Sequence, residues 1–486
     1  MTTNEMTLSQ KITLLLSLLA VLVTKLVPSP PGLPQSGFQV LGILMAAILL
    51  FLSHGTGWTS MAVIFLLMTV PGITAAQVTQ ASFGNSTVVF LMFCFMLAAC
   101  LTESGAAKRI AICFLTNRLS RKSPWWTVVM YFAAVYVLNL FLSAATCIMI
   151  LMPILMEIFK NAGLSREKHS VLTTMLLLST VIIGQLSNGA NPISHAVTSQ
   201  GFSLYESYTG QPMDFFIYCT IGTVISLVGV VAVFLILRFV KRLDVSPFAA
   251  LDFEALSNVH GSMSPRERWS LIIYGICVLF WLLPGLSMHI CPEIYPYFSR
   301  INNCLPPLAA LFVMNFVKVD GEKILDWKTA AASVNWPSFL FIASIMGLGS
   351  FMGREDLGIS QWLSGGLSSA FTGISPLFFV LIMVLTVNVL TNFCSNSVAL
   401  SVVYTIALPL CLNIYHGSLS PMLVSILITS GAQNGWATAP ATPAAAVAYA
   451  SGWGDSRTIL KWGLFIMLVQ IFICVFLGFA LGNMLI

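Results

Sequence analysis

Long apolar runs recur along the whole chain and are separated by short polar or charged segments. A helix needs about 20 residues to cross a bilayer, and runs near that length occupy 12–28, 38–54, 58–75, 87–106, 170–200, 214–240, 269–288, 304–318, 336–353, 421–452 and 459–484. This pattern predicts an all-α polytopic membrane protein with about eleven transmembrane helices.

Two further apolar runs, 124–160 and 373–413, are too long for a single crossing. Each has polar residues at its midpoint, around Ser143 in the first run and from Asn392 to Ser397 in the second. A long run with a polar midpoint is typical of two half-helices that enter and leave the membrane on the same side. We therefore predict two re-entrant hairpins.

The basic residues support this topology. With the N-terminus inside and both hairpins re-entrant, 19 of the 22 Lys and Arg residues lie on one face; Lys25, Arg300 and Arg354 are the exceptions. Basic residues mark the cytoplasmic side of membrane proteins. The sequence thus predicts a multi-pass protein of the plasma membrane, such as a bacterial inner membrane, with a cytoplasmic N-terminus and an external C-terminus.

An internal repeat accompanies the two hairpins. Residues 87–109 resemble the stretch that begins at Phe339, with an offset of 252 residues. The same offset pairs Ser143 with Ser395, and Ala190-Asn191 with Thr442-Pro443. The charge pattern places the hairpin mouths on opposite sides, so the repeats are inverted, a mark of secondary transporters with a midplane binding site. The predicted regions are N-terminal scaffold helices 1–57, first repeat 58–242, cytoplasmic linker 243–268 and second repeat 269–486.

Composition narrows the function. Hydrophobic residues make up 57% of the chain and charged residues 8%, whereas a soluble domain carries about 25% charged residues. This excludes a soluble enzyme, a disordered protein and a disulfide scaffold, and it makes lipid rather than nucleic acid the surrounding partner. No charged residue lies in the middle of a predicted span, and no P-loop or metal-binding cluster appears. We expect neither an enzyme nor an ATP-driven pump, and no organic cofactor.

The hairpin tips are the first candidate site. The second tip, 391–397, contains five polar residues, which are costly in a membrane unless they find partners or line a wet cavity. Half-helices that begin here would direct free N–H groups toward an anion, and freed carbonyls with the Asn396 amide oxygen would suit sodium. The first tip, 139–147, has fewer polar groups, although Asn139 and Ser143 lie one helical turn apart. The alternative for both tips is hydrogen bonding between helices.

Two interrupted spans are the second candidate site. Residues 187–195 contain Gly189 and Pro192, and residues 433–443 contain two prolines. Glycine and proline break a helix and leave backbone groups for a ligand; the alternative is a kink without a ligand. His195 lies at the end of the first interruption, where it is either a sensor of substrate protonation or a hydrogen-bonded structural residue.

At these residues the chain resembles the divalent anion/sodium symporter family, over roughly residues 35–485. That family has a Ser-Asn-Thr motif at each hairpin tip and a Thr-Pro motif in each broken helix. Here Ser395-Asn396-Ser397 and Ala441-Thr442-Pro443 match closely, whereas the first unit departs at Ser143-Ala144-Ala145 and Gly189-Ala190-Asn191-Pro192.

The resemblance implies a homodimer in which a transport domain moves against a scaffold, as an elevator, and carries a small dianion with sodium. It implies a first sodium site of Asn139, Ser143 and Gly189, and a second of Thr391, Cys394, Asn396 and Ala441. The expected substrate ligands are Ser143, Asn191, Ser395, Asn396, Ser397, Thr442 and Pro443. The expected cargo is a C4-dicarboxylate such as succinate or malate. Loss of the first tip's Asn leaves open a sodium-independent dicarboxylate or tricarboxylate exchanger, and a sulfate carrier could use the same groups.

Overall fold

The protein is almost entirely helical. The computed structural model describes residues 6–55, 57–164, 171–193, 195–251, 262–291, 293–298, 304–393, 395–438 and 441–486. Within these ranges the strands are β1 (Lys318–Val319) and β2 (Glu322–Lys323), an antiparallel pair whose Asp320-Gly321 turn has φ values of 54° and 87°. Positive φ at both turn residues is typical of a type I′ hairpin. The predicted all-α class is confirmed.

The helices follow one another through short connections. The first part of the chain forms α1 (Leu8–Leu26), α2 (Gln35–His54), α3 (Trp58–Leu67), α4 (Ala75–Ser82), α5 (Ser86–Glu103), α6 (Ala106–Leu115), η1 (Ser120–Lys122), α7 (Pro124–Phe141), α8 (Ala144–Asn161), α9 (Val171–Asn188), α10 (Ala196–Thr209), α11 (Phe215–Leu235), the π-helical turn η2 (Ile236–Val240) and η3 (Ser246–Ala250).

The second part forms a similar series, preceded by a long helix. It comprises α13 (Pro265–Ile290), α14 (Tyr295–Phe298), α15 (Leu305–Phe316), α16 (Trp327–Ala332), α17 (Trp336–Gly353), η4 (Glu355–Leu357), α18 (Ile359–Phe371), α19 (Pro376–Phe393), α20 (Asn396–Ile414), α21 (Pro421–Ala432), α22 (Pro443–Ala450), α23 (Ser456–Phe472), the π-helical turn η6 (Ile473–Leu477) and α24 (Gly478–Leu485).

Among the described residues, nine helices are long and apolar enough to cross a membrane, and the bent pair α5–α6 makes a tenth candidate. Their burial differs widely. The spanning window of α9 is 94% buried, whereas that of α1 is 17% buried. The high burial places α9 at the centre of the protein. The low burial places α1 at its periphery, where a membrane protein contacts lipid. The protein is therefore polytopic; the predicted count of eleven spans and the inverted relation of the repeats stay predictions.

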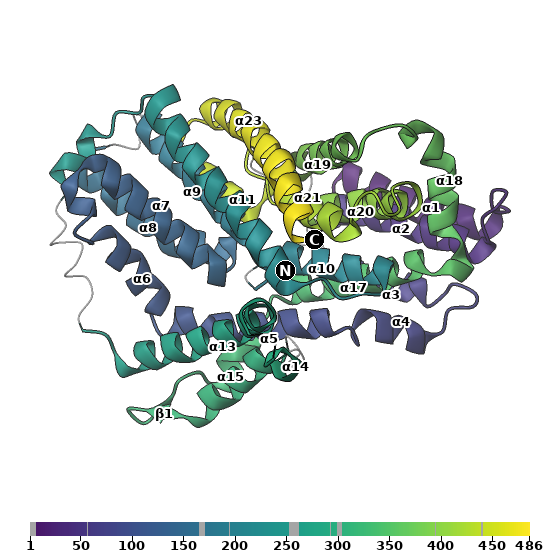
Figure 1. Cartoon of the computed structure of the whole chain (residues 1–486), viewed down its shortest axis with the longest axis horizontal. Helices are drawn as coiled ribbons and strands as arrows, with labels where there is room; N and C mark the ends of the chain where they lie inside the picture. Colours follow the sequence, from purple (N-terminus) through teal and green to yellow (C-terminus); the bar gives the residue numbers. More distant parts are fainter. Residues whose placement is uncertain are drawn as a thin grey trace.

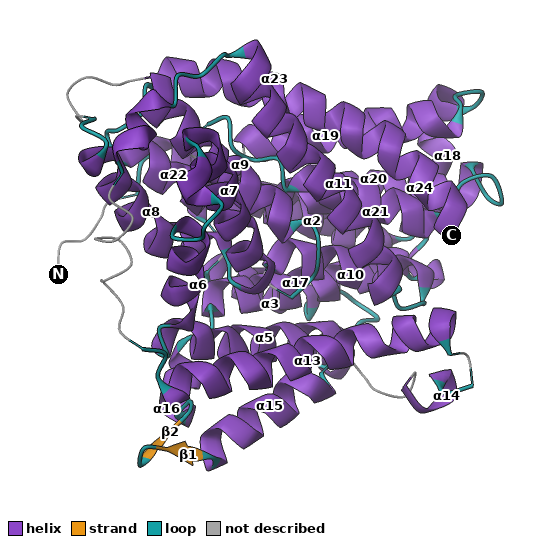
Figure 2. Cartoon of the chain, turned by 60° about the vertical axis from the view of Figure 1, so that its left-hand side comes forward, coloured by secondary structure: helices purple, strands orange, loops and turns teal. Residues whose placement is uncertain are grey.

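Helices α10 and α17 pack against each other, and both contact α5. In Figure 2, α5, α13 and α15 lie together along the lower side, with α14 and α16 at their ends, and α5, α13 and α15 contact one another. Above them, α9, α11, α21 and α23 lie near the middle (Figure 1). Helix α10 contacts both α20 and α21, from the other half of the chain. At this crossing Gly201 lies against the Thr429 side chain with no room for a Cβ, so a small residue permits the close approach.

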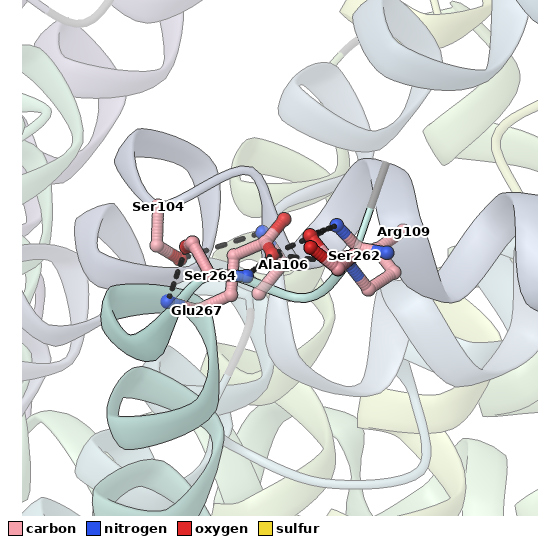
Figure 3. Close-up of polar contacts among 6 residues, drawn as sticks. All are labelled: Ser104, Ala106, Arg109, Ser262, Ser264 and Glu267. Carbon is pink, nitrogen blue, oxygen red and sulfur yellow. Dashed lines mark hydrogen bonds and ion pairs between the residues drawn. The ribbon is translucent and has the colours of Figure 1, made fainter. Parts of the chain in front are cut away.

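A buried ion pair ties the α5–α6 bend to α13. The axis bends by 61° at Gly105, which has a φ of 84°, so the predicted span 87–106 ends where a left-handed residue is required. Beyond the bend, Arg109 Nη2 lies 2.9 Å from Glu267 Oε2, with side chains 16% and 8% exposed. Arg109 also donates to the Ser262 carbonyl, and Glu267 accepts from the Ser264 amide to cap α13 (Figure 3).

Candidate functional site

Both long apolar runs form helical hairpins with very short turns. Helix α7 ends at Phe141 and α8 begins at Ala144; α19 ends at Phe393 and α20 begins at Asn396. In each turn a serine caps the second helix: Ser143 Oγ accepts from the Thr146 amide at 3.2 Å, and Ser395 Oγ accepts from the Val398 amide at 3.3 Å. Serine favours helix N-caps because its hydroxyl satisfies one of the free N–H groups.

The two interrupted spans are broken helices. The first is α9 followed by α10, separated by residues 189–195; the second is α21 followed by α22, separated by residues 433–442. His195 is the N-cap of α10 and makes no capping hydrogen bond with its side chain. Thr442 is the N-cap of α22, and its hydroxyl accepts from the Ala445 amide at 3.2 Å. Pro443 occupies the first turn of α22, where its missing N–H costs nothing.

The four N-caps meet around one cavity. Ser143, His195, Ser395 and Thr442 all line a cavity of about 250 Å³. Its wall continues onto Ala144, Ala196, Asn396, Ser397 and Ala441, next to these caps in the chain. Two sequence-distant hairpins and two broken helices therefore converge on a single chamber.

The opposite wall comes from helices α5 and α17. It consists of Phe95 of α5 with Asn335, Ser338 and Phe341 at the start of α17. Asn335 is the N-cap of α17 and accepts from the Ser338 amide. The hairpins and broken helices thus form one side of the chamber, and helices outside those units form the other.

The chamber suits a small anion without using charged side chains. Asp, Glu, Lys and Arg are absent from its lining within the described part of the chain. Each helix N-terminus carries roughly +0.5 of an elementary charge, so the α8, α10, α20 and α22 termini together supply about +2 in partial charge. The free N–H groups of helix starts are also ready-made anion ligands. The volume lies just below the roughly 300–1,000 Å³ of pockets for drug-sized ligands.

A cluster of oxygen atoms lies beside this chamber in the second unit. Thr391 Oγ1 is 2.6 Å from Asn396 Oδ1 and 2.8 Å from the Ala432 carbonyl oxygen. A Cβ on Gly435 would lie 2.5 Å from Asn396 Oδ1, 3.0 Å from the Thr391 carbonyl oxygen and 3.3 Å from Thr391 Oγ1. Three oxygens therefore surround a space that only glycine leaves open, and the Ala432 carbonyl oxygen lies next to one of them, the Thr391 hydroxyl, which offers one proton among the four. This donor set fits a hard cation such as sodium.

Asn396 presents its two amide atoms differently. Its side chain is 5% exposed, and Oδ1 belongs to the oxygen cluster, whereas Nδ2 has no hydrogen-bond partner in the described part of the chain. Because Asn396 also lines the chamber, this one amide connects the oxygen cluster with the anion-adapted cavity. Burying a donor without a partner costs free energy. Such a donor is typical of a group that binds a ligand.

The second break is held by asparagine side chains of α19. Asn392 Nδ2 donates to the Asn388 and Asn434 carbonyls, both at 2.9 Å, and Asn392 Oδ1 accepts from the Trp436 and Ala437 amides at 3.2 and 2.9 Å. Thr438 Oγ1 donates to the Asn392 carbonyl. The unwound backbone is thus satisfied inside the protein, as non-helical backbone at membrane depth requires.

The described residues of the first unit arrange their oxygens differently. Asn139 Nδ2 donates to the Val135 carbonyl at 2.8 Å, and its Oδ1 is buried without a partner. Ser143 Oγ is 2.9 Å from Thr146 Oγ1. The Gly189 carbonyl accepts from the Tyr218 hydroxyl at 3.1 Å. Ala144 stands where the second unit has Asn396, so the amide that joins the oxygen cluster and the chamber there is missing here.

Asn191 supports the first hairpin rather than lining the chamber. Its Nδ2 donates to the Leu140 carbonyl at 3.1 Å and its Oδ1 accepts from the Ile193 amide at 2.9 Å, and it is not among the described residues of the cavity wall. The equivalent donor in the second unit is Thr438, which lies 247 residues later, as Thr442 does after His195. The offset of 252 therefore holds at the tips, whereas the broken helices follow a different one.

The remaining predicted residues lie close by. Ser397 lines the chamber, and its carbonyl accepts from Gln200 Nε2 of α10 at 2.9 Å. Ala441 also lines the chamber. Cys394 lies outside the described residues. His195 Nδ1 has no hydrogen-bond partner in the described part of the chain, so the hydrogen-bonded structural role is not supported for that nitrogen.

Several residues of the site had no strong signal in the sequence. Gln185 lines the chamber with an unpaired Oε1, and Asn335 and Ser338 close its far side. Asn388 also helps to hold the second break, because its Oδ1 accepts a hydrogen bond from Asn434 Nδ2 at 2.6 Å. Its position one turn before Asn392, in an otherwise apolar run, was the available clue. The others belong to distant segments whose proximity no local pattern indicates.

Two further cavities lie next to one another beside the chamber. A second cavity of about 220 Å³ shares Phe95, Ser143 and Asn335 with the chamber, and a third of about 430 Å³ shares Thr102 with the second. Exposed Lys108 and Glu157 line the third cavity. The three cavities lie along α5, between the first hairpin tip and the surface near Lys108.

A polytopic helical protein in which paired hairpins and broken helices enclose an uncharged, anion-adapted chamber belongs to the class of membrane transporters. Residues 8–486 match the family described as the sodium:sulfate symporter transmembrane region. The protein belongs to this family, as the resemblance at its motifs indicated.

Curated relatives and a solved structure agree with this assignment. The chain is 21% identical to the sodium-dependent dicarboxylate transporter SdcS of Staphylococcus saprophyticus, over 97% of this chain and 91% of that protein. It is 22% identical to SdcS of Staphylococcus aureus, over 96% and 90%. In fold it is similar to the crystal structure of the Alcanivorax borkumensis YdaH transporter, with a TM-score of 0.60 and 12% identity over 97% of this chain and 99% of that one.

Proposed function

We propose that this protein is a sodium-coupled symporter of C4-dicarboxylates. The observation that carries the proposal is the convergence of four helix N-caps on one uncharged chamber, beside an oxygen cluster that shares Asn396 with it. The partial positive charge of the helix starts matches a dianion. The relatives SdcS are named as sodium-dependent dicarboxylate transporters, which supports the same cargo.

The substrate would be held mainly by the second unit. Ser395, Ser397 and Thr442 lie at helix starts on the chamber wall, and Asn396 Nδ2 is an unpaired donor. Ser143 would contact the second carboxylate from the opposite tip. Pro443 would act by setting the start of α22, and Asn191 by holding the first tip in place.

The coupling cation would bind in the oxygen cluster of Thr391, Asn396 and Ala432. Ala441 lies next to Thr442 on the chamber wall, and Cys394 lies outside the described residues. The first set, Asn139, Ser143 and Gly189, shows one unpaired oxygen and a carbonyl that already accepts from Tyr218. We therefore assign sodium coupling to the second unit alone.

Movement of the hairpin units against α5 and α17 would expose the chamber to each side in turn. Support comes from the composition of the wall, one side of which belongs to the hairpins and broken helices and the other to α5 and α17. The cavities that extend toward Lys108 would be the cytoplasmic exit. Dimerisation and the sides of the two termini stay predictions.

Uptake into proteoliposomes tests the function. Labelled succinate should accumulate when an inward sodium gradient is imposed, and unlabelled succinate, malate and sulfate should compete in that order. Accumulation that persists without sodium but requires internal dicarboxylate would contradict symport. That result would favour exchange, the second candidate, which the alanine at position 144 of the first tip supports.

A further inference from the structure

A long apolar groove runs between α7 and α11 on the outer surface of the protein. Its volume is about 980 Å³, and its described lining residues come from these two helices, from Ser123 at the N-cap of α7 and from Arg238 in the turn η2 that follows α11. Exposed Trp126, Leu227 and Val231 line it, with exposed fractions of 42%, 44% and 54%. At its deeper end Tyr136 joins the helices through a 2.7 Å hydrogen bond to Ser226. This groove lies outside the substrate chamber and plays no part in the function proposed above.

One end of the groove carries a cation among aromatic rings. The Arg238 guanidinium carbon lies 5.6 Å from the Trp125 ring centre and 5.9 Å from that of Phe234, and all three residues line the groove. No carboxylate forms an ion pair with Arg238 in the described part of the chain. Arginine with tryptophan is typical of the membrane–water interface.

The surroundings of Arg238 are strongly basic. The segments that flank this end of the groove, 118–122 and 236–244, contain six basic residues (Arg118, Arg121, Lys122, Arg238, Lys241 and Arg242) and one acid, Asp244. Basic pockets between transmembrane helices on the cytoplasmic side bind anionic headgroups. The charge of this end is therefore complementary to a lipid phosphate rather than to a neutral molecule.

The groove is long enough to hold an acyl chain of one leaflet. Along α11 and η2 its residues extend from Leu227 to Arg238, and along α7 and its N-cap from Ser123 to Leu140, which at about 1.5 Å per residue is roughly 16 Å and roughly 26 Å. One leaflet is about half of a ~30 Å hydrocarbon core. An acyl chain that starts at the Arg238 level would therefore end near the membrane centre, beside Tyr136.

We propose that this groove is a binding site for an anionic phospholipid of the cytoplasmic leaflet, with the headgroup phosphate paired with Arg238 and one acyl chain between α7 and α11. Because α7 ends at the hairpin tip that reaches the chamber, the bound lipid would brace α7 against α11. The ligand is identified by its anionic headgroup and by its chain length together.

Lipid retention by the purified full-length protein tests the proposal. The protein in mild detergent is mixed with phosphatidylglycerol or phosphatidylcholine, and bound lipid is counted by native mass spectrometry alongside thermal stability. We expect phosphatidylglycerol to be retained preferentially and to raise the melting temperature. Arg238→Gln should lower phosphatidylglycerol retention about fivefold, the effect of one basic residue near an anionic surface.

Two further variants make the result specific. Val231→Trp fills the groove without changing its charge and should lower retention of phosphatidylglycerol, whereas Lys328→Gln, an exposed basic residue on α16, should behave like the parent. Equal retention of the two lipids by the parent would overturn the proposal. So would parent-like retention in both Arg238→Gln and Val231→Trp. The readouts are binding and stability, so the outcome does not depend on transport.

Discussion

Each hairpin and its broken helix form one unit, and the two units contain the same kinds of helices. They differ in the side chains that link the broken helix to the hairpin. In the second unit, asparagine side chains of the hairpin reach into the break, where Asn392 makes three hydrogen bonds, to Asn434, Trp436 and Ala437. In the first, the asparagine lies in the break and reaches back: Asn191 bonds the hairpin carbonyl of Leu140. The second break is longer, with ten residues between α21 and α22 against seven between α9 and α10.

This difference explains why an oxygen cluster forms in one unit only. The longer break brings Gly435 beside Thr391 and Asn396, and the missing side chain leaves space among their oxygens. In the first unit Ala144 replaces the amide, and the Gly189 carbonyl faces Tyr218 instead. We therefore propose that similar helices produce one unit adapted to a cation and an anion, and another adapted to the anion alone.

The largest expected effect comes from removing the Asn392 side chain, which holds the second break. Asn392→Ala leaves the Trp436 and Ala437 amides and the Asn434 carbonyl without that partner, and each buried unpaired group costs about 1–3 kcal/mol. We expect a loss of about 3–5 kcal/mol in stability and no transport. Asn191→Ala removes two bonds and should cost about 1–3 kcal/mol. Thermal unfolding of both variants in detergent measures the difference. Equal losses would show that Asn392 and Asn191 contribute equally to stability.

Closing the space beside Gly435 should separate sodium coupling from folding. Gly435→Ala places a methyl group 2.5 Å from Asn396 Oδ1, so we expect the sodium concentration for half-maximal uptake to rise at least about tenfold, about 1.4 kcal/mol of binding free energy. Gly275→Ala on α13 is the control, because its Cβ would meet no heavy atom within 4 Å. An unchanged sodium requirement in Gly435→Ala means that the cation binds elsewhere.

The two N-caps of the broken helices should respond differently to truncation. Thr442→Ala removes a capping hydroxyl and should lower stability by about 1 kcal/mol, with weaker substrate binding. His195 makes no capping bond, so His195→Ala should leave stability near the parent value and lower dicarboxylate affinity about fivefold, one neutral hydrogen bond. Melting temperatures with and without succinate distinguish the cases. A stability loss in His195→Ala without an affinity change would indicate a structural role.

The smallest expected effect comes from restoring the missing amide. Ala144 lines the chamber and is 7% exposed, so Ala144→Asn adds a donor and an oxygen at the first tip. We expect the sodium dependence of uptake to change by about threefold or less, because the surrounding oxygen cluster is absent there. A variant whose sodium dependence becomes clearly steeper would show that the first unit lacks only this one side chain.

Much of the fold could be predicted because the patterns involved are local. Polar midpoints in overlong apolar runs placed both hairpins to within a few residues, since serine caps and apolar periodicity act over one or two turns. The predicted span 87–106 ends one residue after Gly105, where the helix bends. Helix α6 beyond the bend was not predicted, because Lys108 and Arg109 interrupt the apolar run there.

The residues of the site could be predicted from the sequence less completely than the fold. The tip residues Ser143, Ser395 and Asn396 could be singled out because polar groups are costly in a membrane. Asn335, Ser338 and Gln185 could not, because their place on the wall depends on how distant helices pack. The supporting role of Asn191 was also hidden, since the sequence does not show which amides are already satisfied by the neighbouring tip.

The ratio of sodium to dicarboxylate moved in each cycle tests the central claim most directly. It can be measured in proteoliposomes as the membrane potential at which net succinate flux reverses under fixed sodium and succinate gradients. With one cation site, in the second unit, the account predicts one sodium ion per succinate and a net negative charge moved inward. A ratio of two or more would contradict it, because the first unit would then have to bind a cation as well.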